Sequence, residues 1–147
     1  ADYCLKVSDV FLNFFFFKPG LVTDARELMD YLRGKGYSLY MCSNGFHEVQ
    51  YRKLKSCGMS DAFDGIVLSE DAGANKPSIE FFTYAMKMSH AEKESTLMIG
   101  DNFSTDILGA KSAGLHTMFF NRHPESFVAS EEVDYEVHSL REIMHIL

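Results

Sequence analysis

The stretch MIGDNFSTDILGAKSAG, residues 98–114, decides the fold of this 147-residue sequence. An apolar segment runs into Gly100-Asp101, a second acid, Asp106, follows five positions later, and small residues then recur at helical spacing. This pattern predicts a buried strand that ends at an acid, followed by a helix with Ser104 as its N-cap and Asp106 in its first turn. Two acids placed in this way favour either a metal site or an ordinary helix start that is stabilised by the helix dipole.

The rest of the chain alternates between short apolar segments and amphipathic ones. Strands are expected at 37–43, 65–69, 95–100 and 115–120, and helices at 24–36, 47–58, 78–88, 104–114 and 139–147. Strands that alternate with helices form parallel βαβ units, so the predicted fold is α/β, a three-layer, doubly wound parallel sheet with a Rossmann-like core. Residues 1–20 fit this pattern poorly, because CLKVSDVFLNFFFF has no clean period, and they are expected to form the tail of a helix and a connection.

Composition narrows the class of protein. Hydrophobic residues make up 46% of the chain and no apolar run is long enough for a bilayer span, so we expect a globular protein and no membrane partner. The net charge of −7 argues against nucleic acid as a partner. An anionic small substrate stays compatible with this charge, since one magnesium ion and one lysine reverse the local field. Three cysteines without metal-ligand spacing favour reduced thiols in a cytoplasmic protein.

Polar residues follow the expected strands. In doubly wound sheets, ligands bind outside the carboxyl ends of the strands. The first expected strand ends at Ser43-Asn44-Gly45, the third at Asp101, and Lys76 precedes a helix between them. Hydroxyl and amide groups would hold phosphate oxygens, the lysine would act as a positive clamp, and the acid would bind a divalent cation. Each element alone also suits a turn, a solvated lysine or a helix cap, but their order at strand ends favours a site.

Three segments resemble a known family. MCSNG (41–45), SEDAGANKPS (69–78) and the opening stretch resemble the second, third and fourth motifs of the haloacid dehalogenase-like (HAD) hydrolases. The resemblance covers about 21–147, and the longer sequences around the first two motifs look like the branch that includes pyrimidine 5′-nucleotidases. It implies an Mg²⁺-dependent phosphoric monoester hydrolase, a phosphatase or nucleotidase, that acts on a small phosphorylated metabolite or a nucleotide.

The resemblance also implies roles for the site residues. Ser43 would bind the phosphoryl group, with Asn44 and the adjacent amides assisting, and Lys76 would neutralise charge on the nucleophile and the phosphate. Asp101 would ligate Mg²⁺ directly, and Asp106 would support the metal site. The acids and Mg²⁺ speak against the dehalogenase chemistry of the same family, which needs no magnesium.

One departure from the family pattern is serious. The family uses an aspartate nucleophile in an Asp-x-Asp motif on an early strand, with the second aspartate as acid and base, and this sequence contains no such motif. Asp9 is followed by Val10-Phe11, so its acid/base partner is missing and we do not expect it to be the nucleophile.

The departure implies an incomplete chain. Residues 1–20 would be a remnant of the cap domain and a connection, and residues 21–147 the C-terminal part of the core, which would lack its first strand and most of the cap. Such a chain would be inactive alone and would self-associate through exposed core surface. The alternative is a catalytically inactive protein of the same fold with a role in binding or assembly.

Overall fold

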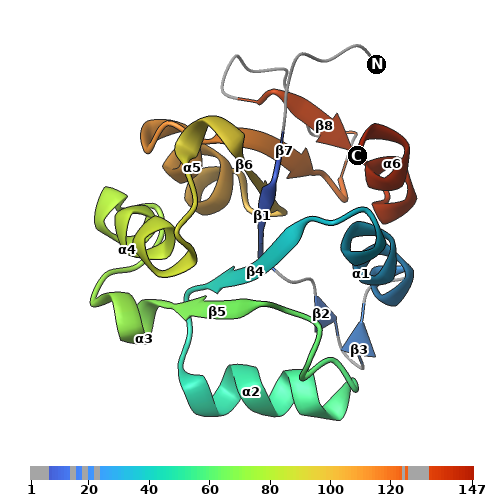
Figure 1. Ribbon diagram of the computed structural model, residues 1–147, viewed down its shortest axis with the longest axis horizontal. Coiled ribbons are helices and arrows are strands. Elements are labelled where there is room, and N and C mark those ends of the chain that lie inside the picture. The colour runs from blue at the N-terminus through green and yellow to red at the C-terminus, as the bar shows by residue number, and fades with distance from the viewer. Residues whose placement is uncertain (1–6, 14–15, 18–19, 22–23, 124, 126–132) are drawn as a thin grey trace.

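A single parallel sheet organises the chain. The computed structural model describes residues 7–13, 16–17, 20–21, 24–123, 125 and 133–147. The strands of the sheet are β1 (Asp9–Leu12), β4 (Ser38–Ser43), β5 (Gly65–Leu68), β6 (Thr96–Gly100), β7 (His116–Phe120) and β8 (Tyr135–Val137). They are all parallel and lie in the order β5-β4-β1-β6-β7-β8 (Figure 1). Two short strands, β2 (Phe16–Phe17) and β3 (Gly20–Leu21), form a separate antiparallel pair.

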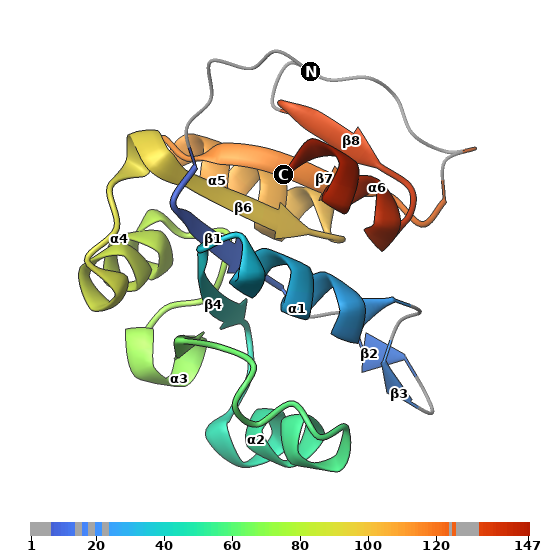
Figure 2. The ribbon, with the colours of Figure 1, turned by 45° about the vertical axis from the view of Figure 1, so that its right-hand side comes forward.

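Helices cover both faces of the sheet. They are α1 (Ala25–Gly34), α2 (His47–Ser56), α3 (Ser69–Ala72), α4 (Ile79–Ser89), α5 (Gly109–Ser112) and α6 (Leu140–Ile146), with a 3₁₀ turn, η1 (Lys93–Ser95), and a π-helical segment, η2 (Phe103–Leu108). Helices α1 and α6 pack on one face, and α4 and α5 on the other (Figure 2). The predicted doubly wound parallel sheet is thereby confirmed. Of the helices that the structure describes, none is long and apolar enough to cross a membrane.

Alternating side chains of the central strands fill both halves of the core. On β1, Val10 and Leu12 belong to the cluster under α1 and α6, whereas Phe11 belongs to the cluster under α4 and α5. All three are fully buried. Because helices cover both faces, a strand at this position is apolar at every residue instead of alternating with polar ones.

The position of β1 corrects one expectation. Residues 1–20 were expected to lie outside the core, and the core to lack its first strand, but residues 9–12 form the strand between β4 and β6. The segment shows no period because it is buried on both faces, and this hid it from periodicity analysis. A vacant centre of the sheet was the reason to expect self-association, and β1 fills that centre. The structure also adds β8 and α3, which the sequence did not predict.

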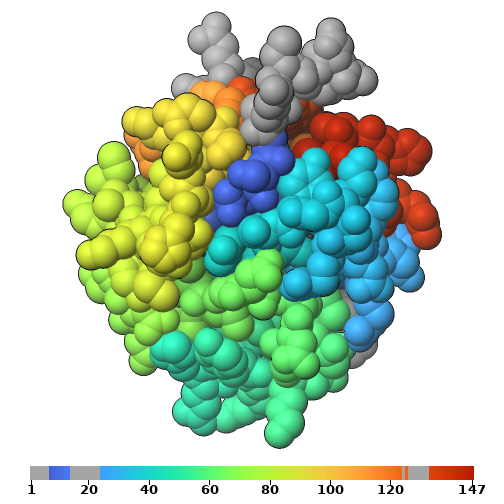
Figure 3. All heavy atoms as spheres, viewed as in Figure 1, coloured from blue at the N-terminus to red at the C-terminus, as the bar shows by residue number. Residues whose placement is uncertain are grey.

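Asp9 lies at the amino edge of the sheet. It starts β1, in register with Ser38 and Thr96 at the starts of β4 and β6. The space-filling view shows the first described residues between the cyan segment that leads into β4 and the yellow segment that leads into β6 (Figure 3). Parallel strands deliver their ligand-binding residues at the opposite edge, so this position agrees with the view that Asp9 is not the nucleophile.

Candidate functional site

The carboxyl ends of three adjacent strands bring the candidate site together. β4 ends at Ser43, β6 is followed by Asp101, and β1, which lies between them, is followed by Asn13. The Asn13 backbone N–H continues the sheet by donating to the Ile99 carbonyl at 3.0 Å. The parallel register therefore places a hydroxyl, an amide and a carboxylate side by side at one edge.

A buried ion pair forms the floor of the site. Lys76 Nζ lies 2.5 Å from Asp106 Oδ1 and donates a second hydrogen bond to the Cys42 carbonyl at 2.9 Å. The side chains of Lys76 and Asp106 are 2% and 0% exposed. A charge can be buried this deeply only when it is paired and hydrogen-bonded, so each of these two residues requires the other.

The segment that carries Asp106 is held close to the end of β6. Asn102, not Ser104, is the N-cap of η2, and its side chain accepts from the Thr105 N–H at 3.1 Å. Asp106 therefore points back toward the site, where its Oδ2 also accepts from the Asn102 N–H at 3.2 Å. A Cβ atom at Gly100 would collide with the Asp106 side chain, so this glycine permits the close approach.

A second glycine permits close packing of the next turn. A Cβ atom at Gly109 would lie 2.8 Å from the Phe82 ring and 2.9 Å from Pro77. Gly109 therefore lets α5 approach the segment just after Lys76, which fixes one partner of the ion pair relative to the other.

Asn13 joins the two acids. Its Nδ2 donates to Asp106 Oδ2 at 2.9 Å and to Asp101 Oδ1 at 3.3 Å. Sequence reasoning missed this residue because it did not identify the strand that ends before it. The available signal was a polar residue directly after the buried apolar run Val-Phe-Leu.

Asp101 faces an arginine that the sequence also did not single out. Arg122 follows β7 at the same edge of the sheet, and its Nη2 lies 2.8 Å from Asp101 Oδ2. Burial raises the pKa of the Asp101 carboxyl above its usual range; Arg122 opposes this shift, and the nearby Asp106 adds to it. The local environment thus disfavours two carboxylate charges and favours a cation beside them.

The last residue of β4 and the two that follow it provide a hydroxyl and two positioning groups. Ser43 is mostly buried, and its hydroxyl makes no hydrogen bond within the part of the chain that the structure describes. Asn44 holds the main chain of Lys76, accepting from its N–H at 2.7 Å and donating to its carbonyl at 3.0 Å. The Gly45 N–H donates to Ser69 Oγ at 3.0 Å. Phosphate contacts by Asn44 and Gly45 stay predictions, because both groups already bind protein.

The donor set suits a hard cation. Asp106 is fully buried and accepts from three protein donors, whereas the Asp101 side chain is 18% exposed, so Asp101 and the Asn13 amide oxygen are the candidate ligands. Mg²⁺ is held through one or two carboxylates and keeps several waters, so a single carboxylate with an amide oxygen beside it fits this ion. No group of three or more His, Cys, Asp or Glu side chains with metal-binding geometry occurs among the described residues.

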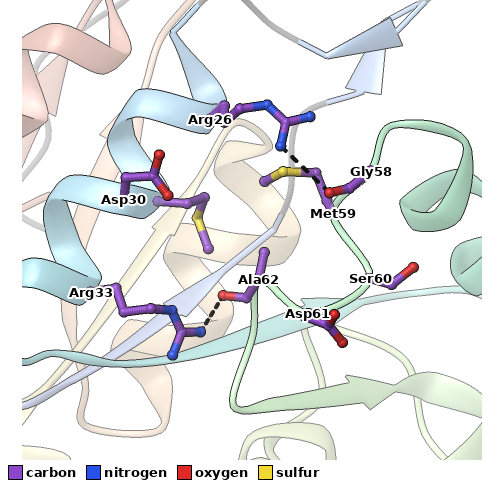
Figure 4. A pocket seen from close by; sticks show the side chains of 9 residues that line it. Arg26, Asp30, Arg33, Gly58, Met59, Ser60, Asp61 and Ala62 are labelled. Carbon is purple, nitrogen blue, oxygen red and sulfur yellow. Dashed lines mark hydrogen bonds between the residues drawn. The ribbon is translucent and has the colours of Figure 1, made fainter.

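A separate cavity of about 460 Å³ lies between α1 and the segment that joins α2 to β5 (Figure 4). Arg26 and Arg33 reach across it from α1 and donate to main-chain carbonyls, Arg33 to that of Ala62 at 2.5 Å. The lining residues are Arg26, Met29, Asp30, Arg33, Gly58, Met59, Ser60, Asp61 and Ala62. None of the residues of the candidate site lines it, and its arginines tie α1 to the neighbouring segment.

Comparisons with known proteins agree with this architecture. The family model of haloacid dehalogenase-like hydrolases matches residues 14–114. The putative HAD-hydrolase YfnB of Bacillus subtilis (strain 168) is 35% identical over 128 residues, which are 86% of this chain and 54% of YfnB. The pyrimidine 5′-nucleotidase YjjG of Escherichia coli (strain K12) is 31% identical over 143 residues, which are 97% of this chain and 63% of YjjG. The chain spans just over half the length of most of the curated relatives named among its matches.

Solved structures give the same result. The crystal structure of an HAD phosphatase from Thermococcus onnurineus matches with a TM-score of 0.78 at 32% identity, over 86% of this chain and 57% of that one. The structure of B. subtilis YfnB bound to magnesium matches with a TM-score of 0.78 at 35% identity, over 86% of this chain and 56% of that one. The resemblance carried by the three sequence motifs is confirmed, and the chain belongs to the haloacid dehalogenase-like hydrolase family.

Proposed function

We propose that the protein containing this chain is an Mg²⁺-dependent, phosphatase-type hydrolase of small phosphate monoesters, with nucleotides and sugar phosphates as the candidate substrates. The single observation that carries the proposal is the buried pair of Lys76 and Asp106 beside Asp101 and Ser43, at the carboxyl edge of the sheet. Relatives named as pyrimidine 5′-nucleotidases and as glyceraldehyde 3-phosphate phosphatases support this class of substrate.

The residues of the chain would divide the work of binding. The Ser43 hydroxyl donates to a phosphoryl oxygen. Lys76 has three N–H donors, of which Asp106 and the Cys42 carbonyl use two, so one is left for a second phosphoryl oxygen. Asp101 and the Asn13 amide oxygen would hold Mg²⁺, which supplies positive charge that offsets the charge of the phosphate. Asp106 supports the site by fixing Lys76 and Asn13 rather than by ligating the metal.

The described site holds an amide where the resemblance implies a nucleophilic carboxylate on the central strand. Asn13 directly follows β1, and the sequence has Phe15 two positions later, so neither acid of an Asp-x-Asp motif is present here. An amide does not replace the carboxylate as a nucleophile at neutral pH. We therefore expect this chain by itself to bind a phosphate monoester with Mg²⁺ without turning it over.

Calorimetry and a turnover assay with p-nitrophenyl phosphate test the proposal. Binding of the ester in the presence of Mg²⁺ should weaken about 10-fold or more in Ser43→Ala, the loss expected for a hydrogen bond to a charged group. Ser60→Ala changes an exposed serine between α2 and β5, which lines the separate cavity and not the candidate site, and should leave the affinity unchanged. Equal affinity of wild type and Ser43→Ala for the ester would refute the assignment of Ser43 to the phosphate site.

The alternative is a non-catalytic protein of this family that binds a phosphorylated ligand, and Asn13 is the observation that favours it. Turnover by a longer protein that contains this chain separates the two functions, because its nucleophilic carboxylate would have to come from residues outside this chain. Hydrolysis that Asp101→Asn abolishes establishes the phosphatase, whereas ligand binding without turnover in the longer protein establishes the alternative. Hydrolysis by the present chain that Asp101→Asn abolishes would contradict the inactivity argued from Asn13.

A further inference from the structure

Both carboxylate oxygens of Asp101 are already engaged. Oδ2 faces the Arg122 guanidinium at 2.8 Å, and Oδ1 accepts from the Asn13 amide at 3.3 Å. The side chains of Arg122 and Asp101 are 29% and 18% exposed, so the pair is shielded from much of the solvent. A guanidinium therefore stands at the carboxylate to which the proposed function assigns a divalent cation.

Mg²⁺ and the Arg122 guanidinium repel each other when both contact the Asp101 carboxylate. Mg²⁺ binds a carboxylate oxygen at about 2.1 Å. The Arg122 guanidinium would then lie within a few ångströms of the metal, in a partly buried site where salt screens their repulsion poorly. Either the guanidinium stays or the metal enters.

We propose that Arg122 occupies the cation position at Asp101 in the metal-free protein, and that a divalent cation enters by displacing its guanidinium. The inference rests on the proposed function in one respect, namely that Asp101 is the metal ligand. Arg122 is then a positioning residue that sets the affinity and selectivity of the metal site without touching the substrate.

Lys76 has no such freedom. Its side chain is only 2% exposed, and its ammonium is fixed by the buried Asp106 and by the Cys42 carbonyl. Arg122 instead lies in the segment just after β7, where 29% of its side chain is exposed although its Nη1 is buried, so the guanidinium can leave Asp101 only by turning outward into water. Of the two cationic side chains beside the acids, Arg122 is the exchangeable one.

Calorimetric titration of the chain with MgCl₂ tests the exchange. Arg122→Gln removes the competing charge and should bind Mg²⁺ about 3-fold to 5-fold more tightly, the upper part of the range that a partly exposed ion pair supplies. The matched control is Arg141→Gln, which removes an arginine paired with Asp24 elsewhere on the surface and should change the affinity less than about 2-fold. Unchanged or weaker binding in Arg122→Gln would show that the arginine orients Asp101 for the metal, and would overturn the proposal.

A second measurement needs no substitution in the protein that is titrated. The ¹⁵N side-chain NMR signals of Arg122, assigned by their loss in Arg122→Gln, should move toward those of a solvated arginine as Mg²⁺ saturates the site, while those of Arg141 stay in place. Arg122 signals that do not move at saturation would overturn the exchange.

Asp101→Asn separates failure of this inference from failure of the proposed function. If it abolishes Mg²⁺ binding while Arg122→Gln does not strengthen it, the metal site stands and the exchange is wrong. If Mg²⁺ binding is unchanged in Asp101→Asn, Asp101 is not the ligand and both proposals fall. Tighter binding in Arg122→Gln that Asp101→Asn abolishes supports both.

Discussion

Lys76→Met should be among the most destabilising single substitutions in the chain. The methionine fills a similar volume but leaves the Asp106 carboxylate, which is fully buried, without its counter-charge. Removing one partner of a buried pair costs about 3–5 kcal/mol of unfolding free energy. Folded domains have about 5–15 kcal/mol in total, so the loss takes a large share of the stability and should lower the melting temperature by about 10 °C or more.

Urea denaturation followed by circular dichroism measures this loss. Lys87→Met, on the exposed face of α4, is the matched control and should stay within about 0.5 kcal/mol of wild type. A double-mutant cycle with Asp106→Asn should give a coupling of about 2–3 kcal/mol, because the second change removes the stranded charge. A loss below about 1 kcal/mol in Lys76→Met, or no coupling in the cycle, would refute the argument that the two residues require each other.

Three further predictions concern single side chains. Burial raises the pKa of the Cys42 thiol to about 12, so iodoacetamide at pH 8 should alkylate Cys57 well before Cys42, as peptide mass spectrometry would show; similar rates in the native protein would contradict this. The hydrogen bond to Asp71 raises the pKa of His47 above its ordinary 6.5, so the stabilising effect of this pair should be present below pH 6.5 and lost as the pH rises through the raised value; Asp71→Asn should lower the pKa seen by NMR, and an unchanged titration would disprove the assignment. Gly100→Ala should cost about 1–3 kcal/mol of unfolding free energy and weaken Mg²⁺ binding, since its methyl group displaces the neighbouring buried carboxylate; a neutral result in both assays would mean that the close approach is dispensable.

Much of the site was predictable because its chemistry sits at strand ends. Ser43 and Asp101 directly follow apolar runs, and the rule that parallel strands share one ligand-binding edge suffices to place them together. Lys76 was placed by its position before a helix and by the family resemblance. Its partner Asp106 was expected to support the metal, which stays a prediction; the structure adds that this residue is fully buried and paired with Lys76.

The parts that were missed depend on tertiary contacts. Asn13 could not be found while β1 was hidden, since a strand buried on both faces carries no period. Asn102 and Ser104 are both good capping residues two positions apart, and only packing of η2 against the end of β6 selects the first. Arg122 follows an aromatic strand, but the sequence does not show that its side chain turns toward Asp101.

The central position of β1 also has a kinetic consequence. Asn13 contacts Asp101 and Asp106, which lie 88 and 93 residues later in the chain, because the earliest strand of the described sheet lies between two later ones. Closing a loop of this length costs conformational entropy before the contacts between the strands can form. Pairing of β1 with β6 therefore belongs to the slow, non-local part of folding. The edge that carries the proposed cation site is consequently assembled only when the sheet closes around its first strand. If the proposal holds, the gain of metal affinity during refolding should report that closing step rather than the earlier formation of helices.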